Sequence, residues 1–127
     1  MILGLGSDLC DIRRIESALE RHGPRFTERL FTEVERAYAD AKPPRTRAGT
    51  YAKRFAAKEA ASKAFGTGIG AELSLTSIGV LNGPEGEPVI ELDDKARALL
   101  AARGASRLLI SLTHTDTLAQ AFAVLVR

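Results

Sequence analysis

The spacing of apolar residues changes several times along the chain, and these changes predict a mixture of strands and helices. Runs in which apolar residues alternate or follow one another predict strands at Ile2–Leu9, Leu75–Leu81, Pro88–Leu92, Leu108–His114 and Leu118–Val126. Spacings of three and four predict helices over residues 12–21, 25–30, 32–40, 50–65 and 93–102. This order of elements predicts an α+β fold with a mainly antiparallel sheet packed against the long helix.

Several boundaries of these elements have their own sequence signals. Asp11 is suited to cap the first helix, and Thr32 with Glu35 forms a capping box for the third. Lys42–Gly49 contains two consecutive prolines and is predicted to be a connector. Gly4 and Gly6 would weaken a free-standing strand, so close packing or a ligand near the backbone is expected there.

The composition is that of one ordinary globular domain. The 127 residues, of which 45% are hydrophobic and 27% charged, predict a single domain over 1–127. No apolar run could cross a bilayer, and the first residues lack the features of a signal peptide. Cys10 is the only cysteine, which favours a cytoplasmic location. With two histidines and one cysteine, any metal is expected to be a hard ion with oxygen ligands.

Positive charge is concentrated in one part of a chain whose net charge is only +2. Seven cations stand against Glu59 alone between Lys42 and Lys63. A polyanionic ligand of limited size and a solvated helix face are both consistent with this cluster. The two C-terminal strands, by contrast, are apolar at nearly every position, which predicts cover on both faces and therefore oligomerisation.

The helix ending near Phe65 combines acidic, basic and small residues in a way that suggests a site. Glu59 and Lys63 are four residues apart and share one strip of the helix, an arrangement also typical of a simple helical ion pair. Gly66 is expected to end the helix. The glycine-rich run to Gly70 follows a helix, whereas phosphate loops of the Rossmann and P-loop types join a strand to a helix.

Three separated segments of the chain stand out. The segments read Gly4-Leu-Gly-Ser-Asp8-Leu-Cys-Asp11-Ile-Arg-Arg14-Ile, Arg54-Phe-Ala-Ala-Lys-Glu59-Ala-Ala-Ser-Lys63-Ala-Phe-Gly-Thr-Gly-Ile-Gly70 and Ile110-Ser-Leu-Thr-His114-Thr. Together, and in this order, they resemble one enzyme family, the holo-acyl-carrier-protein synthases. The resemblance spans the whole chain, and the middle segment is the most specific. It implies the fold of the small homotrimeric 4′-phosphopantetheinyl transferases, with active sites between adjacent subunits.

The resemblance also implies a reaction and its metal. The family moves the phosphopantetheine arm of coenzyme A to a serine of apo acyl carrier protein, for fatty acid biosynthesis, and releases adenosine 3′,5′-bisphosphate. Asp8 and Glu59 match its magnesium ligands, which suits the need of a pyrophosphate for a hard divalent cation. Glu59, Asp8 and a metal-bound water all remain candidates for the base that takes the serine proton.

Further positions match residues that contact the coenzyme. Lys63 matches the residue at the pyrophosphate, Arg54 and His114 match residues around the 3′-phosphate, and the backbone at Gly66 is expected to approach the coenzyme. Thr46 stands where the family often has a basic residue, so either Arg45 or Arg47 is expected to replace it. Glu87 stands where lysine is common in the turn near the adenine, and Lys58 is either part of the basic patch or solvated.

The acidic carrier protein needs a basic receiving surface. Arg14, Arg21 and Arg25 provide one on and after the first helix, with Phe26 as an apolar contact, and a solvated mixed-charge face is the alternative. A carrier of a polyketide or peptide synthase is a second possible acceptor. A different hypothesis is a non-catalytic protein that binds nucleotides or nucleic acid through the basic cluster. Against it, the few aromatic residues are not interleaved with the cations, as base stacking would require. We therefore expect no nucleic acid and no membrane among the partners.

Overall fold

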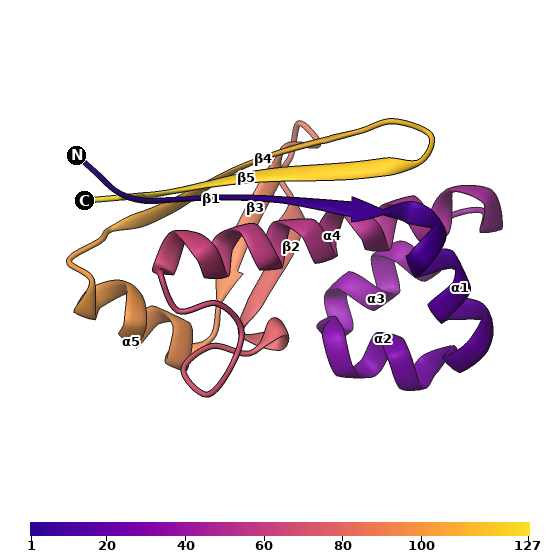
Figure 1. Cartoon of the computed structure of the whole chain (residues 1–127), viewed down its shortest axis with the longest axis horizontal. Coiled ribbons are helices and arrows are strands. Elements are labelled where there is room, and N and C mark those ends of the chain that lie inside the picture. Colours follow the sequence, from indigo (N-terminus) through magenta and orange to yellow (C-terminus); the bar gives the residue numbers. More distant parts are fainter.

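The computed structural model describes all 127 residues (Figure 1). Five strands, five α-helices and one short 3₁₀-helix follow one another in the order predicted for an α+β fold. Their bounds are β1 Ile2–Asp11, α1 Ile12–His22, α2 Pro24–Leu30, α3 Glu33–Asp40, α4 Pro44–Phe65, η1 Leu75–Ser77, β2 Ile78–Asn82, β3 Pro88–Leu92, α5 Asp94–Ala102, β4 Arg107–His114 and β5 Leu118–Val126.

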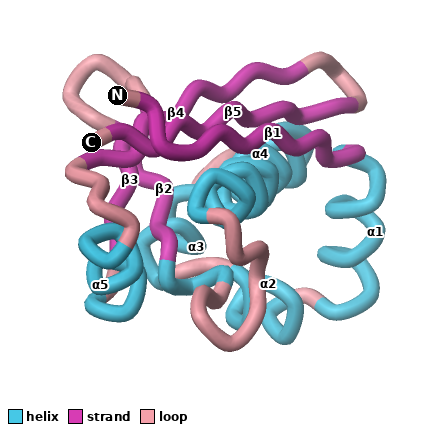
Figure 2. Tube along the Cα trace, turned by 60° about the vertical axis from the view of Figure 1, so that its left-hand side comes forward, coloured by secondary structure: helices cyan, strands magenta, loops and turns pink.

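All strand pairs are antiparallel, as predicted. The main sheet has the order β1-β5-β4, and β2 and β3 form a separate hairpin (Figure 2). The two ends of the chain lie side by side at one end of this sheet, where the Arg127 amide donates to the Met1 carbonyl at 3.0 Å. The strand β5 is therefore central, with β1 and β4 as the edges.

Helix α4 lies along one face of the main sheet and is the centre of the molecule (Figures 1 and 2). The side chains that it buries are mostly alanines: Ala48, Ala52, Ala56, Ala57, Ala60, Ala61 and Ala64. Small side chains let the sheet approach the helix closely. A Cβ atom built on Gly4 or Gly6 would lie 1.9 Å from the carbonyl oxygen of Ala64 or Ala60. Of the two explanations for these glycines, close packing is the one observed.

Helices α1 to α3 form a cluster beside the N-terminal half of α4 (Figure 1). Asp11 caps α1 by accepting from the Arg13 amide, and the capping box of Thr32 and Glu35 is present at α3. Phe31 is buried against the ring of Tyr51, with 4.7 Å between the ring centroids. The predicted caps are thus confirmed.

Two predicted boundaries are wrong. The expected connector Lys42–Gly49 is largely helical, because Pro44 occupies the first turn of α4, where its missing N–H costs no intrahelical hydrogen bond. The strand predicted at Leu75–Leu81 begins only at Ile78. Before it, Ser74 and Ser77 satisfy each other's backbone groups and close a single 3₁₀ turn instead.

The face of the main sheet that points away from α4 is apolar and exposed. Because side chains alternate along a strand, Ala119, Ala121 and Ala123 of β5 face the helix, whereas Leu118 and Phe122 face outward. The exposed apolar residues of the three strands are Ile2, Leu5, Leu9, Leu109, Leu118 and Phe122. None of the helices is long and apolar enough to span a membrane.

Candidate active site

Two acids that are distant in the sequence lie close to one lysine between β1 and α4. Asp8 shares the α4-facing side of β1 with Gly6 and Cys10, both of which are buried. The Lys63 ammonium is 3.2 Å from Asp8 Oδ1 and donates to the Ser7 carbonyl at 3.0 Å. The side chain of Lys63 is 52% exposed and that of Asp8 18%, so the cluster opens to solvent on the lysine side.

Glu59 lies one helical turn before Lys63 on α4, and therefore on the same side of that helix. Partial burial raises the pKa of the Glu59 carboxyl, and the negative charge of Asp8 raises it further, while Lys63 acts in the opposite direction. A negative charge near the Glu59 carboxyl disfavours its ionisation, and a bound cation would offset that effect. The expected meeting of Asp8 and Glu59 around one ion stays a prediction, which the effect of Asp8 on the pKa of Glu59 favours.

The donor set of this cluster fits a magnesium ion. Two carboxylates and nearby backbone carbonyl oxygen are hard oxygen ligands, and Mg²⁺ is commonly held by one or two carboxylates plus substrate phosphates. No group of three or more His, Cys, Asp or Glu side chains is placed to hold a metal.

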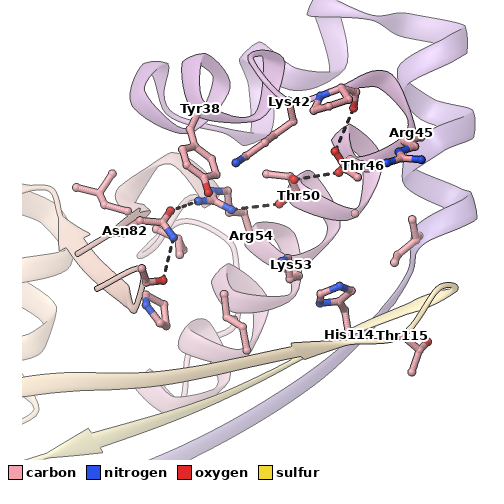
Figure 3. Close-up of a pocket in the computed structure, with 18 of the residues that line it drawn as sticks. Tyr38, Lys42, Arg45, Thr46, Thr50, Lys53, Arg54, Asn82, His114 and Thr115 are labelled. Carbon is pink, nitrogen blue, oxygen red and sulfur yellow. Dashed lines mark hydrogen bonds between the residues drawn. The ribbon is translucent and has the colours of Figure 1, made fainter. Parts of the chain in front are cut away.

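A separate cavity of about 780 Å³ lies between the start of α4, the end of β4 and the β2–β3 turn (Figure 3). Its charged or titratable lining is mainly basic: Lys42, Arg45, Lys53, Arg54 and His114, with Asp116 as the one acid. Such a cavity offers several donors to an anionic ligand with a polar body. Arg54 and His114, two predicted coenzyme residues, are both in its wall.

Arg54 is held rigidly in this wall. Its side chain is 4% exposed, donates to Asn82 Oδ1 at 2.6 Å and to the Thr50 carbonyl at 3.4 Å, and lies over the Tyr38 ring (Figure 3). Its Nε is buried without a partner. Burial lowers the pKa of the Arg54 guanidinium. A pre-oriented, incompletely satisfied cation is suited to bind a phosphate.

The structure distinguishes between the two arginines that were left as alternatives. Arg45 and Thr46 line the cavity. Arg47 instead donates to the carbonyls of Asp40 and Lys42, at 3.1 and 2.9 Å, where it caps the end of α3. Arg45 is therefore the one positioned toward a ligand of the cavity.

Comparisons with known proteins identify the family of the chain. Residues 4–122 match the family model of the 4′-phosphopantetheinyl transferase superfamily. The chain belongs to this superfamily. Two relatives, each called holo-[acyl-carrier-protein] synthase, come from Chelativorans sp. and Granulibacter bethesdensis. They are 53% and 50% identical to it, over 98% and 99% of this chain and 96% and 88% of their own.

Solved structures of holo-acyl-carrier-protein synthases have the same fold. The enzyme from Neisseria meningitidis superposes with a TM-score of 0.91 at 33% identity, with both chains covered completely. The enzyme from Bacillus anthracis, solved in complex with coenzyme A, gives 0.83 at 37% identity over 98% of this chain and 96% of the other. The predicted family, fold class and enzyme class, a phosphopantetheinyl transferase, are thereby confirmed.

The predicted site residues of this phosphopantetheinyl transferase do not all lie in one place. Asp8, Glu59, Lys63 and Gly66 do not line the basic cavity, whereas Arg54 and His114 do. Gly66 ends α4 in the left-handed conformation, with φ of 85°, as expected, and leads into the glycine-rich loop. The predicted site residues of one chain therefore lie in two separate places, which we call half-sites: the region of Asp8, Glu59 and Lys63, and the basic cavity.

One basic residue of the transferase was misassigned. Lys58 is neither part of the basic patch nor solvated: it is fully buried, with its ammonium 2.6 Å from Glu35 Oε1. The seven cations between Lys42 and Lys63 consequently do not form one patch. Lys58 lies in the interior, Arg47 caps α3, and Lys63 pairs with Asp8.

The predicted carrier-binding residues of the transferase lie on α1 and α2. Arg14, Arg21 and Arg25 are exposed and form no ion pair, and Phe26 is half-buried with its ring against Phe31. The positive charge of Arg14 helps to lower the pKa of the Asp11 carboxyl, after the stronger effects of Arg13. Arg14 is thus close to the junction of β1 and α1, a short way along the chain from Asp8.

Two residues of the cavity were not anticipated. Tyr38 lies within 4.5 Å of the Lys42 ammonium and 4.4 Å of the Arg54 guanidinium, and Asn82 orients Arg54. Tyr38 is on the exposed side of α3, and Asn82 is the last residue of β2, so neither has a sequence signal beyond its residue type. Glu87, which stands where the family often has a lysine, does not line the cavity. Its carboxylate folds back and accepts a hydrogen bond from the Glu85 amide.

Proposed function

We propose that this protein transfers the 4′-phosphopantetheine group of coenzyme A to a serine of apo acyl carrier protein. The reaction releases adenosine 3′,5′-bisphosphate and serves fatty acid biosynthesis in the cytoplasm. The observation that carries the proposal is the 3.2 Å contact between Lys63 and Asp8, which come from segments more than fifty positions apart, with Glu59 one turn before Lys63 on α4. The names of the relatives support the same acceptor.

The basic cavity suits the adenosine end of coenzyme A. Arg45, Arg54 and His114 offer donors for the 3′-phosphate, and Asn82 and the turn at Gly86 and Pro88 offer polar and flat surfaces for the base. Because these groups lie on α4, β2 and β4, the cavity is preformed. A preformed site reduces the entropic cost of orienting a flexible ligand.

The acid pair suits the pyrophosphate and its metal. Asp8 and Glu59 would hold a Mg²⁺ ion, which when bound would polarise the phosphate and offset its charge. Lys63 would contact the leaving bisphosphate and neutralise the charge that develops on it. The carboxylates of Asp8 and Glu59 would be available to accept the serine proton.

We further propose a homotrimer in which each active site uses two subunits. The separation of the acid pair from the cavity supports this, as does the exposed apolar face of the main sheet. A cyclic arrangement would bury that face and bring the cavity of one subunit to the acid pair of the next.

A complementation experiment tests the shared site. The Glu59→Gln variant and an Arg45→Ala/His114→Ala variant are each expected to be inactive, because each lacks one half-site. When the two variants are co-expressed and their subunits mix at random, each half-site of an active site is intact with a probability of about one half. Both half-sites are therefore intact in about a quarter of the active sites. We expect about a quarter of wild-type kcat, measured by mass spectrometry of the carrier. No recovered activity in demonstrably mixed trimers would contradict the shared site.

Arg14→Glu is expected to raise KM for the carrier about tenfold or more and to leave KM for coenzyme A unchanged. The physical reason is the loss of an exposed, unpaired cation that attracts an acidic partner. Arg103→Glu makes the same change in net charge on the distant α5 side and serves as the control. Steady-state kinetics at two salt concentrations would check the result, since added salt should weaken the wild-type attraction. Equal effects of the two variants would contradict docking at α1.

The decisive experiment is incubation of the protein with coenzyme A, Mg²⁺ and apo acyl carrier protein, followed by intact mass measurement. The carrier should gain one phosphopantetheinyl group, and EDTA should prevent the gain. Apo carriers of polyketide and peptide synthases in parallel reactions would establish the acceptor. If no carrier gains mass while the protein still binds coenzyme A in EDTA, a non-catalytic nucleotide-binding protein is the correct reading.

A further inference from the structure

A completely buried ion pair joins α3 to the middle of α4. The side chains of Lys58 and Glu35 are both 0% exposed, and Lys58 Nζ is 2.6 Å from Glu35 Oε1. The Lys58 ammonium also donates to the carbonyls of Leu75 and Ile78, at 2.8 and 2.5 Å. The Glu35 carboxylate accepts from the amides of Thr32 and Val80, both at 2.8 Å.

These bonds join four elements of the fold. Glu35 belongs to α3, Lys58 to the middle of α4, Leu75 to η1, and Ile78 and Val80 to β2. Glu59 follows Lys58 directly on α4, and Asn82, which orients Arg54, ends β2. The pair is therefore connected to both half-sites through short, rigid pieces of backbone.

Stability alone is a weak explanation for such a pair. Removing two charges from water costs about as much as their attraction returns, and an apolar pair of similar volume is often as stable. The directional bonds supply something that apolar contacts on α4 do not. The buried surface of this helix is mostly alanine, which offers few ridges to resist rotation or sliding against its neighbours.

We propose that Lys58 and Glu35 are positioning residues for the transfer reaction. Their bonds set the rotation of α4, and since consecutive helical residues are about 100° apart, they set the direction in which Glu59 and Lys63 point toward Asp8. The same bonds hold β2 so that Asn82 meets Arg54. This inference rests on the proposed function, because it assigns the pair a role in that site.

The test is a double variant, Glu35→Leu/Lys58→Met, compared with each single change. Either single change leaves a buried charge without its partner and should lower the Tm. The double variant should recover most of that loss, because no unpaired charge remains. We nevertheless expect its kcat to fall tenfold or more and its Mn²⁺ affinity, measured by electron paramagnetic resonance, to fall about as much. KM for the carrier should stay unchanged, because the α1 surface is intact.

Wild-type kcat and Mn²⁺ affinity in the double variant would overturn the proposal and leave the pair a purely structural role. If the double variant does not fold, Glu35→Gln, which keeps the shape of the side chain, decides instead. It should lower kcat and Mn²⁺ affinity with an unchanged KM for the carrier, and wild-type values would equally overturn the proposal. Glu33→Gln, at an exposed position in the first turn of the same helix, is the control.

Failure of the proposed function would look different. In that case the wild-type protein would not modify the carrier at all. The Mn²⁺ affinities of the wild-type and variant proteins would still report whether the buried pair orients Glu59. The two conclusions are therefore tested by separate measurements.

Discussion

Glu59→Gln is expected to lower kcat for phosphopantetheine transfer by about a thousandfold or more, the scale seen when a preorganised electrostatic group at a reacting centre is removed. The amide has nearly the same shape as the carboxylate but no charge, so the cluster would lose one of its two anionic ligands. Asp8 and Lys63 would remain paired at 3.2 Å, so the effect should be on the chemistry and not on the fold.

The same variant has an expected stability signature. In the metal-free protein the pKa of Glu59 is raised by burial and by Asp8, so its ionised form is less favourable in the folded state than in the unfolded chain. For a carboxyl with a raised folded pKa, stability falls as the pH rises from the ordinary pKa through the raised one. In EDTA, the Glu59→Gln variant should therefore melt at the same temperature as the wild-type protein or at a higher one. Any increase in melting temperature should be present at neutral pH and absent in acid.

Calorimetric melting in EDTA and single-turnover transfer kinetics would measure these effects together. Glu72→Gln, at an exposed position in the loop after α4, is the matched control and should change neither. Near-normal transfer by the Glu59 variant at low Mg²⁺ would refute the metal-ligand assignment. A large drop in melting temperature would show that Glu59 is needed for the fold.

Gly6→Ala is expected to lower the free energy of unfolding by about 3 kcal/mol or more, at the upper end of the usual cost of overpacking. The new Cβ would lie 1.9 Å from the Ala60 carbonyl oxygen and 2.9 Å from the Ala64 amide nitrogen. Both are backbone atoms of a helix and cannot rotate away. Relief would require β1 to move off α4, which would also displace Asp8 from Lys63.

Thermal unfolding would test this, with an expected decrease in Tm of more than about 10 °C. Gly70→Ala is the matched control: nothing lies within 4 Å of its Cβ position and its φ is not positive, so the Tm should hardly change. An unchanged Tm in the Gly6 variant would show that β1 and α4 do not depend on this close approach.

Local features of the sequence predicted most elements correctly. Asp11, Thr32 and Gly66 marked helix ends that are confirmed, because caps and left-handed glycines act within a few residues. The errors lie where local signals compete. Pro44 was compatible with both a connector and the first turn of a helix. Apolar spacing predicted a strand before Ile78, where Ser74 and Ser77 instead close a 3₁₀ turn.

The candidate site was predictable only as far as its chemistry depends on residue type and spacing. Glu59 and Lys63 share a helix strip whatever the rest of the chain does, and the three segments identified the family. The partner of each cation was not predictable in this way. Lys58, Arg47 and Lys63 are equivalent in a charge count, yet one is buried, one caps a helix and one pairs with Asp8.

The amino-acid sequence by itself determined the order of the elements, which follows from short-range patterns, and the family, which follows from the resemblance of three segments. The same resemblance led to the prediction of Asp8, Glu59 and Lys63 as site residues. Only the tertiary structure decided that Gly6 accommodates the backbone of α4, that Lys58 pairs with Glu35, and that the basic cavity is separate from the acid pair. The reason is physical: burial and charge pairing depend on which distant segments meet, and a pattern of neighbouring residues does not contain that information.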